Sequence, residues 1–87
     1  MTDKPSTPDL EAVILRLLGQ RAAGASICPS DAARAARTSG WRALINDVRT
    51  AAGRLAARGE VDVTQRGRVV DIGEARGPVR IRKHQPG

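Results

Sequence analysis

One apolar stripe at helical spacing, followed by a change to alternation at every second residue, most constrains the fold of this chain. The stripe recurs at three- and four-residue intervals over about 18 residues and predicts a long amphipathic helix. Gly59 follows as the expected helix stop, because glycine readily adopts the left-handed conformation that ends many helices. A long helix followed directly by strand patterns predicts an α+β fold. The stripe comprises Trp41, Leu44, Ile45, Val48, Ala52 and Leu55.

A first, shorter helix is expected near the start of the chain. Thr7 is the expected N-cap, followed by Pro8 and by acidic residues that complement the positive end of the helix dipole. The helix is expected to end near Ala23, with Gly24 as its stop. Its apolar residues predict one buried stripe made of Leu10, Val13, Ile14, Leu17 and Leu18.

Pro29 begins a second predicted helix, with Cys28 at the N-cap and Asp31 in the first turn. The alanines that follow, up to Ala36, favour a thin helix that can pack closely against its neighbours. Ile27 is a lone branched residue before this helix. We expect it to pair with a hairpin as a short bridge.

Two short strands are expected to form a hairpin around a turn that contains Gly67. Residues 61–64 and 69–72 each place apolar side chains at alternate positions, and residues 79–82 repeat this pattern as a third, C-terminal strand. The order of three helices, a hairpin and a last strand predicts a winged-helix fold. In that fold the second and third helices form a helix-turn-helix, and the hairpin is the wing.

At 87 residues the chain is long enough for one small domain. We expect a flexible leader at residues 1–7, a winged-helix-like domain at residues 8–83 and a frayed tail at residues 84–87. With one Trp and neither Phe nor Tyr, the core must consist of smaller apolar residues, which argues against a site for a bulky cofactor. The polar N-terminus and the single Cys28 favour a cytoplasmic protein. No apolar run exceeds four residues, so we expect no membrane contact.

Residues needed for catalysis or metal binding do not occur together in this sequence. Cys28 and His84 are the only cysteine and histidine, whereas a zinc site needs three or four such ligands at suitable spacing. No nucleophile has an identifiable base, and no glycine-rich phosphate loop precedes a helix. We therefore expect a protein with no catalytic residues, no cofactor and no metal.

Positive charge is concentrated in the long helix and beyond it. The chain has 15 Lys and Arg residues against 9 Asp and Glu, and its net charge is +6, yet residues 1–36 sum to zero. Residues 37–58 contain five arginines against Asp47 alone. This distribution favours a polyanionic partner, because each phosphate that is neutralised releases condensed counterions. An ordinary solvated surface is the alternative.

The face of the long helix opposite the apolar stripe carries residues suited to contact nucleic acid. Arginine pairs well with guanine and asparagine with adenine, while hydroxyl groups can donate to phosphates. Arginines on both sides of the expected wing turn can reach phosphates or a minor groove. Residues 80–83 would extend this surface only if the last strand lies beside the wing. The predicted nucleic-acid-binding residues are Ser39, Arg42, Asn46, Arg49, Thr50, Arg66 and Arg68.

Each of these residues has a simpler interpretation as a solvent-facing side chain on an amphipathic helix or a charged turn. Trp41 has both a core and a base-stacking interpretation. We assign it to the core because it continues the apolar stripe.

The chain also contains spaced motifs: Cys28-Pro29-Ser30-Asp31-Ala32-Ala33-Arg34, Trp41-Arg42, Val48-Arg49, Ala52, Leu55, Gly59, Thr64-Gln65-Arg66-Gly67 and Gly77-Pro78-Val79-Arg80. Over roughly residues 10–83 these motifs resemble a family of short bacterial domains catalogued as a domain of unknown function. The resemblance implies a winged-helix-like fold, no established activity and no catalytic residues. Ala32 stands where such domains often carry a larger aliphatic residue, which would thin the packing under the second helix.

We therefore predict a winged-helix module that binds double-stranded DNA without catalysis, mainly through phosphates, and that would suit a role in transcription. An adaptor that uses the same basic face for an acidic protein is the second hypothesis. RNA binding is the third, because the near absence of aromatic side chains disfavours stacking of unpaired bases.

Overall fold

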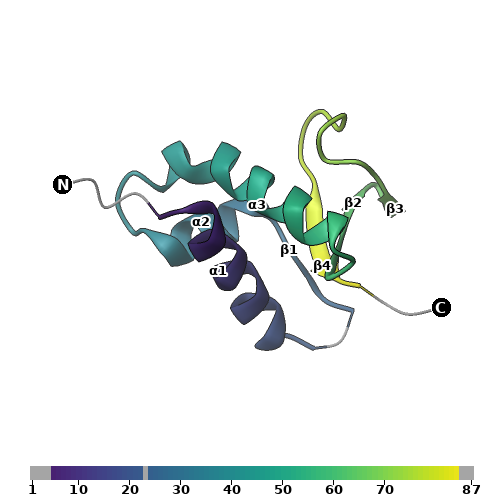
Figure 1. Cartoon of the computed structure of the whole chain (residues 1–87), viewed down its shortest axis with the longest axis horizontal. Coiled ribbons are helices and arrows are strands. Elements are labelled where there is room, and N and C mark those ends of the chain that lie inside the picture. The colour runs from purple at the N-terminus through teal and green to yellow at the C-terminus, as the bar shows by residue number, and fades with distance from the viewer. Residues whose placement is uncertain (1–4, 23, 85–87) are drawn as a thin grey trace.

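In a computed structural model, the described part of the chain forms three α-helices and a four-stranded antiparallel sheet (Figure 1). The structure describes residues 5–22 and 24–84. The predicted α+β class is confirmed, and the arrangement is compatible with a winged-helix-like fold. In chain order the elements are α1 (Thr7–Gly19), β1 (Ser26–Ile27), α2 (Pro29–Ala36), the 3-10 helix η1 (Trp41–Leu44), α3 (Ile45–Ala57), β2 (Val61–Gln65), β3 (Arg68–Val69) and β4 (Arg80–Lys83).

The N-cap of α1 is Ser6 and not Thr7, which already belongs to the helix. The Asp9 N–H donates to Ser6 Oγ (3.2 Å), and the Ser6 N–H donates to the Asp9 carboxylate (3.0 Å). This reciprocal capping box satisfies two backbone donors, and the bond from the Ser6 backbone lowers the pKa of Asp9. The expected leader therefore contains the start of the helix. The helix ends at Gly19, earlier than expected, and Ala23 lies outside the described residues.

Cys28 is the N-cap of α2, as predicted. Its backbone N–H donates to the Asp31 carboxylate (3.0 Å), and this bond lowers the pKa of Asp31. The first turn of α2 is thus tied to the residue that enters it from β1.

The predicted long helix is divided into the 3-10 turn η1 and the α-helix α3. Its apolar stripe is confirmed, since Leu44, Val48, Ala52 and Leu55 are fully buried, while Trp41 and Ile45 are half-buried against the same core. The predicted stop at Gly59 is also confirmed. Gly59 has a φ of 75°, a conformation that glycine adopts without steric cost.

The strand order is β1-β4-β2-β3, so the C-terminal strand lies inside the sheet. Ile81 of β4 is opposite Val63 of β2 and Ile27 of β1, and all three side chains are buried. Ile27 therefore forms the predicted short bridge, but its partner is the C-terminal strand and not the hairpin. β4, the last strand in the sequence, thus connects β1 to the hairpin formed by β2 and β3.

The turn between β2 and β3 is tight and lies at Arg66-Gly67. Both residues have positive φ, 54° and 82°, as a two-residue type I′ hairpin turn requires. The hairpin predicted around Gly67 is confirmed, but its second strand is shorter than expected, because β3 ends at Val69. The Val70 N–H still donates to the Val63 carbonyl (2.8 Å) before the chain leaves the sheet.

Residues 70–79, which we call the wing loop, connect β3 to β4. Figure 1 shows this loop rising beside the C-terminal end of α3 before the chain returns to the sheet. Ile72, predicted to lie in a strand, instead packs against the core from this loop. No helix in the described part of the chain combines the length and the apolar character needed to cross a membrane.

Candidate nucleic-acid interface

The N-terminal half of the outer face of α3 is exposed. Asn46 and Thr50 lie on it with exposed side chains, as the helical periodicity predicts, and Arg42 is exposed just before it in η1. The Thr50 hydroxyl donates to the Asn46 carbonyl (3.1 Å), so it is held against its own helix. Ser39 is exposed in the connection between α2 and η1. These positions can meet a partner without rearrangement of the backbone.

Arg49 lies on the same side of α3, but its guanidinium group is engaged within the protein. It donates to the carbonyl oxygens of Ala75 (3.1 Å) and Gly77 (3.2 Å), both in the wing loop. Its side chain is accordingly half-buried. In this arrangement Arg49 holds the wing loop against α3, whereas the sequence pattern suggested a side chain directed at bases.

The wing loop covers the same face of α3 at Gly53. A Cβ atom added at Gly53 would lie 2.9 Å from Cγ2 of Ile72, closer than ordinary van der Waals contact. Glycine at this position therefore permits the loop to approach the helix backbone. The loop therefore covers the outer face at Gly53, whereas Ala57 at the end of α3 is exposed.

Two hollows flank the wing loop. The first, the helix hollow, has a volume of about 260 Å³ and lies between α3 and the start of the loop. The second, the wing groove, has a volume of about 910 Å³ and lies between the hairpin and the end of the loop. The helix hollow is lined by Asn46, Arg49, Thr50, Ile72 and Gly73. The wing groove is lined by Gln65, Arg66, Arg68, Val70, Arg76, Gly77 and Pro78.

Three arginines line the wing groove, and none of its described lining residues is acidic. Arg66 and Arg68 come from the hairpin as predicted, and Arg76 comes from the wing loop. Gln65 fixes the loop beside the hairpin, because its side-chain amide donates to the carbonyls of Arg76 and Pro78. The groove is therefore lined by three arginines from two segments of the chain, an arrangement suited to binding anions.

Trp41 contacts the core and carries two cations on its ring. The guanidinium carbons of Arg34 and Arg42 lie 4.5 Å and 4.6 Å from the ring centroid. The ring is half-buried against the core, which agrees with the structural interpretation of this residue. Its exposed part nonetheless holds both arginines near the N-terminal end of the long helical stretch.

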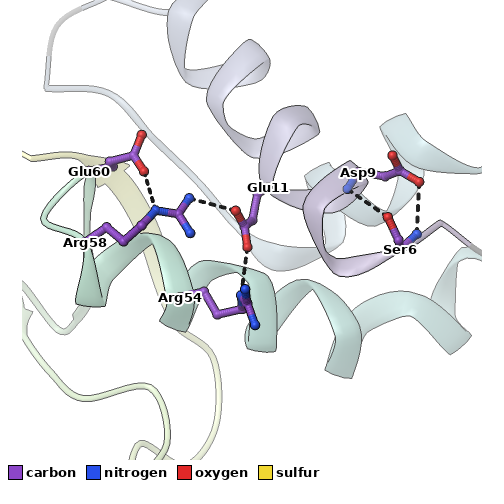
Figure 2. A network of polar contacts seen from close by, with 6 residues as sticks. All are labelled: Ser6, Asp9, Glu11, Arg54, Arg58 and Glu60. Atoms are coloured by element: carbon purple, nitrogen blue, oxygen red, sulfur yellow. Dashed lines mark hydrogen bonds and ion pairs between the residues drawn. The ribbon is translucent and has the colours of Figure 1, made fainter.

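Arg54 of α3 and Arg58, the C-cap residue of this helix, form ion pairs with Glu11 of α1. In Figure 2 the Glu11 carboxylate lies between the two guanidinium groups. Its oxygens are 3.0 Å from Arg54 Nε and 2.7 Å from Arg58 Nη2. Arg58 also pairs with Glu60 (2.8 Å). The Arg58 hydrogen bond lowers the pKa of the buried Glu11 carboxylate, and Arg54 acts in the same direction. These two cations are thus neutralised by carboxylates and belong to the packing of α1 on α3.

The cations of β4 are largely occupied as well. Arg80 donates to the Ser26 hydroxyl (2.9 Å) and carbonyl (3.0 Å), and Arg82 lies 3.5 Å from the Asp62 carboxylate. The last strand does lie beside β2, yet only Lys83 of residues 80–83 is exposed without a described partner.

The lone cysteine and histidine both have structural contacts. Cys28 Sγ lies 2.8 Å from Ser30 Oγ beside the start of α2. His84, expected in a frayed tail, contacts Asp62 through its ring (2.8 Å), and its backbone N–H donates to the Glu60 carbonyl (3.2 Å). The hydrogen bond with His84 lowers the pKa of Asp62. The remainder of the expected tail, residues 85–87, lies outside the described residues.

Two arginines at these surfaces were missed by the sequence analysis. Arg76 lies directly before the Gly77-Pro78 turn, a position that places a charged residue beside a chain reversal. Arg34 lies seven residues before Trp41, across the helix connection, so no regular periodicity relates the two. The turn signal could have identified Arg76, but only the fold brings Arg34 to the tryptophan.

Comparison with known protein families agrees with the resemblance found in the sequence motifs. The profile of the family described as "Protein of unknown function (DUF3253)" matches residues 7–84, from the first residue of α1 to the residue after β4. A search of curated proteins found no match. The chain therefore belongs to the DUF3253 family of proteins of unknown function.

Proposed function

We propose that this protein binds double-stranded DNA without catalysis, with α2 and α3 as a helix-turn-helix and the hairpin with its wing loop as the wing. The observation that carries the proposal is the wing groove, in which Arg66, Arg68 and Arg76 face an open space without a lining carboxylate. Phosphates would neutralise these guanidinium groups and release counterions. The proposal includes a cytoplasmic location, which the single cysteine suits.

The helix hollow gives this surface a second part. Asn46 and Thr50 of α3 line it, and Arg42 is exposed in the preceding η1 turn. Arg49 links α3 to the loop that borders the wing groove. We assign base contacts to Asn46 and phosphate contacts to Arg42 and Ser39. The Thr50 hydroxyl already donates to the Asn46 carbonyl, so a phosphate contact at Thr50 requires exchange of that bond. Arg49 is assigned to positioning, because its donors already bind backbone carbonyls.

Fluorescence anisotropy across a salt series tests the proposal, with random duplex DNA, single-stranded DNA and hairpin RNA as probes. Duplex DNA should bind most tightly, with a log-log salt slope of about −4 to −6 if roughly five or six phosphates are contacted. Tighter binding of hairpin RNA would contradict the DNA assignment in favour of RNA. No binding of any probe at low ionic strength would contradict nucleic-acid binding and favour an acidic protein partner.

A further inference from the structure

Arg34 and Arg42 share one aromatic ring although they come from different elements. Arg34 is in α2 and Arg42 is in η1, and both side chains are exposed over the half-buried Trp41. Each guanidinium carbon lies within 4.6 Å of the ring centroid. We call these three residues the Arg-Trp-Arg cluster.

The cluster concentrates positive charge without internal compensation. Both carbons are measured from the same centroid, so their separation cannot exceed the sum of 4.5 Å and 4.6 Å. Each cation is attracted to the ring, but the two like charges repel each other. Within residues 5–22 and 24–84, neither side chain forms an ion pair or a hydrogen bond. An anion placed at the cluster would relieve this repulsion.

The geometry also leaves hydrogen-bond donors available. A guanidinium group that lies over a ring uses its face, while its N–H groups lie in its plane and can donate at its edges. Because Trp41 packs against the core, the ring is a fixed platform for both side chains. Cations held in this way lose less conformational freedom when they bind a phosphate.

The position of the cluster complements that of the wing groove. Eleven residues separate Arg42 in η1 from Gly53, where the wing loop contacts α3, which is roughly 17 Å along the helical stretch. This separation exceeds the width of a B-DNA major groove, about 12 Å. The cluster lies at one end of this stretch and the wing loop, which also borders the wing groove, lies near the other, so the two sets of arginines suit contacts on either side of a groove that α3 enters.

We propose that Arg34 and Arg42 bind phosphates of the duplex backbone at the junction of α2 and η1, with Trp41 as the positioning residue. This inference rests on the proposed DNA binding and adds Arg34 and Trp41 to it. The Arg-Trp-Arg cluster would contact the phosphates of one DNA strand, and the arginines of the wing groove would contact those of the other strand.

Salt-dependent duplex binding by R34Q, R42Q and W41L, each compared with the control R16Q on the exposed side of α1, tests the inference. R34Q and R42Q should each reduce the magnitude of the log-log salt slope by about 0.9, the contribution of one phosphate, whereas R16Q should retain the wild-type slope. W41L keeps both charges, yet it should also reduce the slope because their platform is lost. Trp41 is the only Trp and the chain has no Tyr, so intrinsic fluorescence should change on duplex addition and report this cluster alone.

The outcomes separate this inference from the proposal on which it rests. Duplex binding with a wild-type slope in both R34Q and R42Q, or with unchanged Trp41 fluorescence at saturation, would overturn the inference alone. Failure of the wild-type protein to bind duplex DNA at low salt would overturn both. A reduced magnitude of the log-log salt slope in R34Q and R42Q, with an unchanged slope in R16Q, supports the inference. Circular dichroism checks that each variant is folded.

Discussion

The backbone of Gly53 in α3 lies against the side chain of Ile72 in the wing loop, with only 2.9 Å available between an added Cβ atom and Ile72 Cγ2. This contact covers the helix face at Gly53, which the sequence pattern presents as open. Arg49 binds the same loop through the carbonyls of Ala75 and Gly77. The helix and the wing loop therefore form one surface, and the position of the loop determines which residues a partner can reach.

A double-mutant cycle between Gly53 and Ile72 tests this contact. Alanine favours a helix over glycine by about 1 kcal/mol, so G53A should raise the free energy of unfolding by that amount in an I72A background. In the wild-type background the new methyl group meets Ile72, and the gain should be lost. Urea unfolding of the four proteins gives the coupling energy. Equal gains from G53A in both backgrounds would show that the loop does not lie on the helix.

Replacement of Arg49 by Met should release the wing loop. The substitution removes two charge-assisted hydrogen bonds to loop carbonyls and should lower the free energy of unfolding by about 1–2 kcal/mol. Hydrogen exchange should accelerate at the amides of residues 73–77. R68M removes an exposed arginine of the edge strand and should change stability by no more than about 0.5 kcal/mol. Unchanged exchange in R49M would indicate that the loop is held by other contacts.

Arg66 has a φ of 54°, a conformation that asparagine and glycine tolerate better than arginine. R66N should therefore stabilise the hairpin, by up to about 1 kcal/mol, while it weakens DNA binding through the loss of one positive charge. R68N removes the same charge from a strand position and should bring no stabilisation. Thermal unfolding and anisotropy measure the two effects separately. A lower melting temperature for R66N than for R68N would contradict the turn assignment.

The ion pairs of Glu11 predict a loss of stability in acid. The Arg58 hydrogen bond lowers the pKa of Glu11 from its ordinary value of 4.5, so these pairs stabilise the fold at pH values above 4.5 and their contribution is lost as the pH falls through the folded-state pKa. The pKa values of Asp31 and Asp62 are also lowered, from an ordinary value of 3.8, so these carboxylates likewise contribute less stability as the pH falls.

The free energy of unfolding of the wild-type protein should therefore decrease below about pH 4.5. E11Q should be less stable at neutral pH and should depend less on pH in this range. E74Q changes an exposed carboxylate of the wing loop and serves as the control. Urea unfolding from pH 3 to 7 measures all three proteins. A pH dependence of E11Q as steep as that of wild type would contradict the role of Glu11.

The helices and the turn at Gly67 were predictable because their signals are local. Apolar spacing identified the buried stripe through Leu55, and Gly59 identified the end of the long helix. Ser6 and Thr7 carry the same capping chemistry one residue apart, so the pattern alone placed the start of α1 at the wrong residue. The extent of α1 was overestimated because Gly24 follows a turn and does not end the helix directly.

The wing loop was not predictable because its conformation depends on contacts between distant segments. Ile72 continues an alternating strand pattern, yet packing beside Gly53 takes it out of the sheet. The same contacts engage Arg49, which periodicity alone assigns to the open side of the helix. The exposed positions of Asn46, Arg66 and Arg68 were predictable, and their role in binding stays a prediction. A turn signal could have added Arg76, whereas only the fold brings Arg34 to Trp41.

The salt dependence of duplex binding tests most directly whether the arginines of the wing groove contact phosphates. The comparison is between wild type, R66Q/R68Q and the matched control R16Q/R21Q, whose two positions line neither hollow. We predict that R66Q/R68Q reduces the magnitude of the log-log slope by about 1.8 and that the control leaves it unchanged. Equal slopes for all three proteins, or an equal reduction in both variants, would contradict the assignment of phosphate binding to the groove.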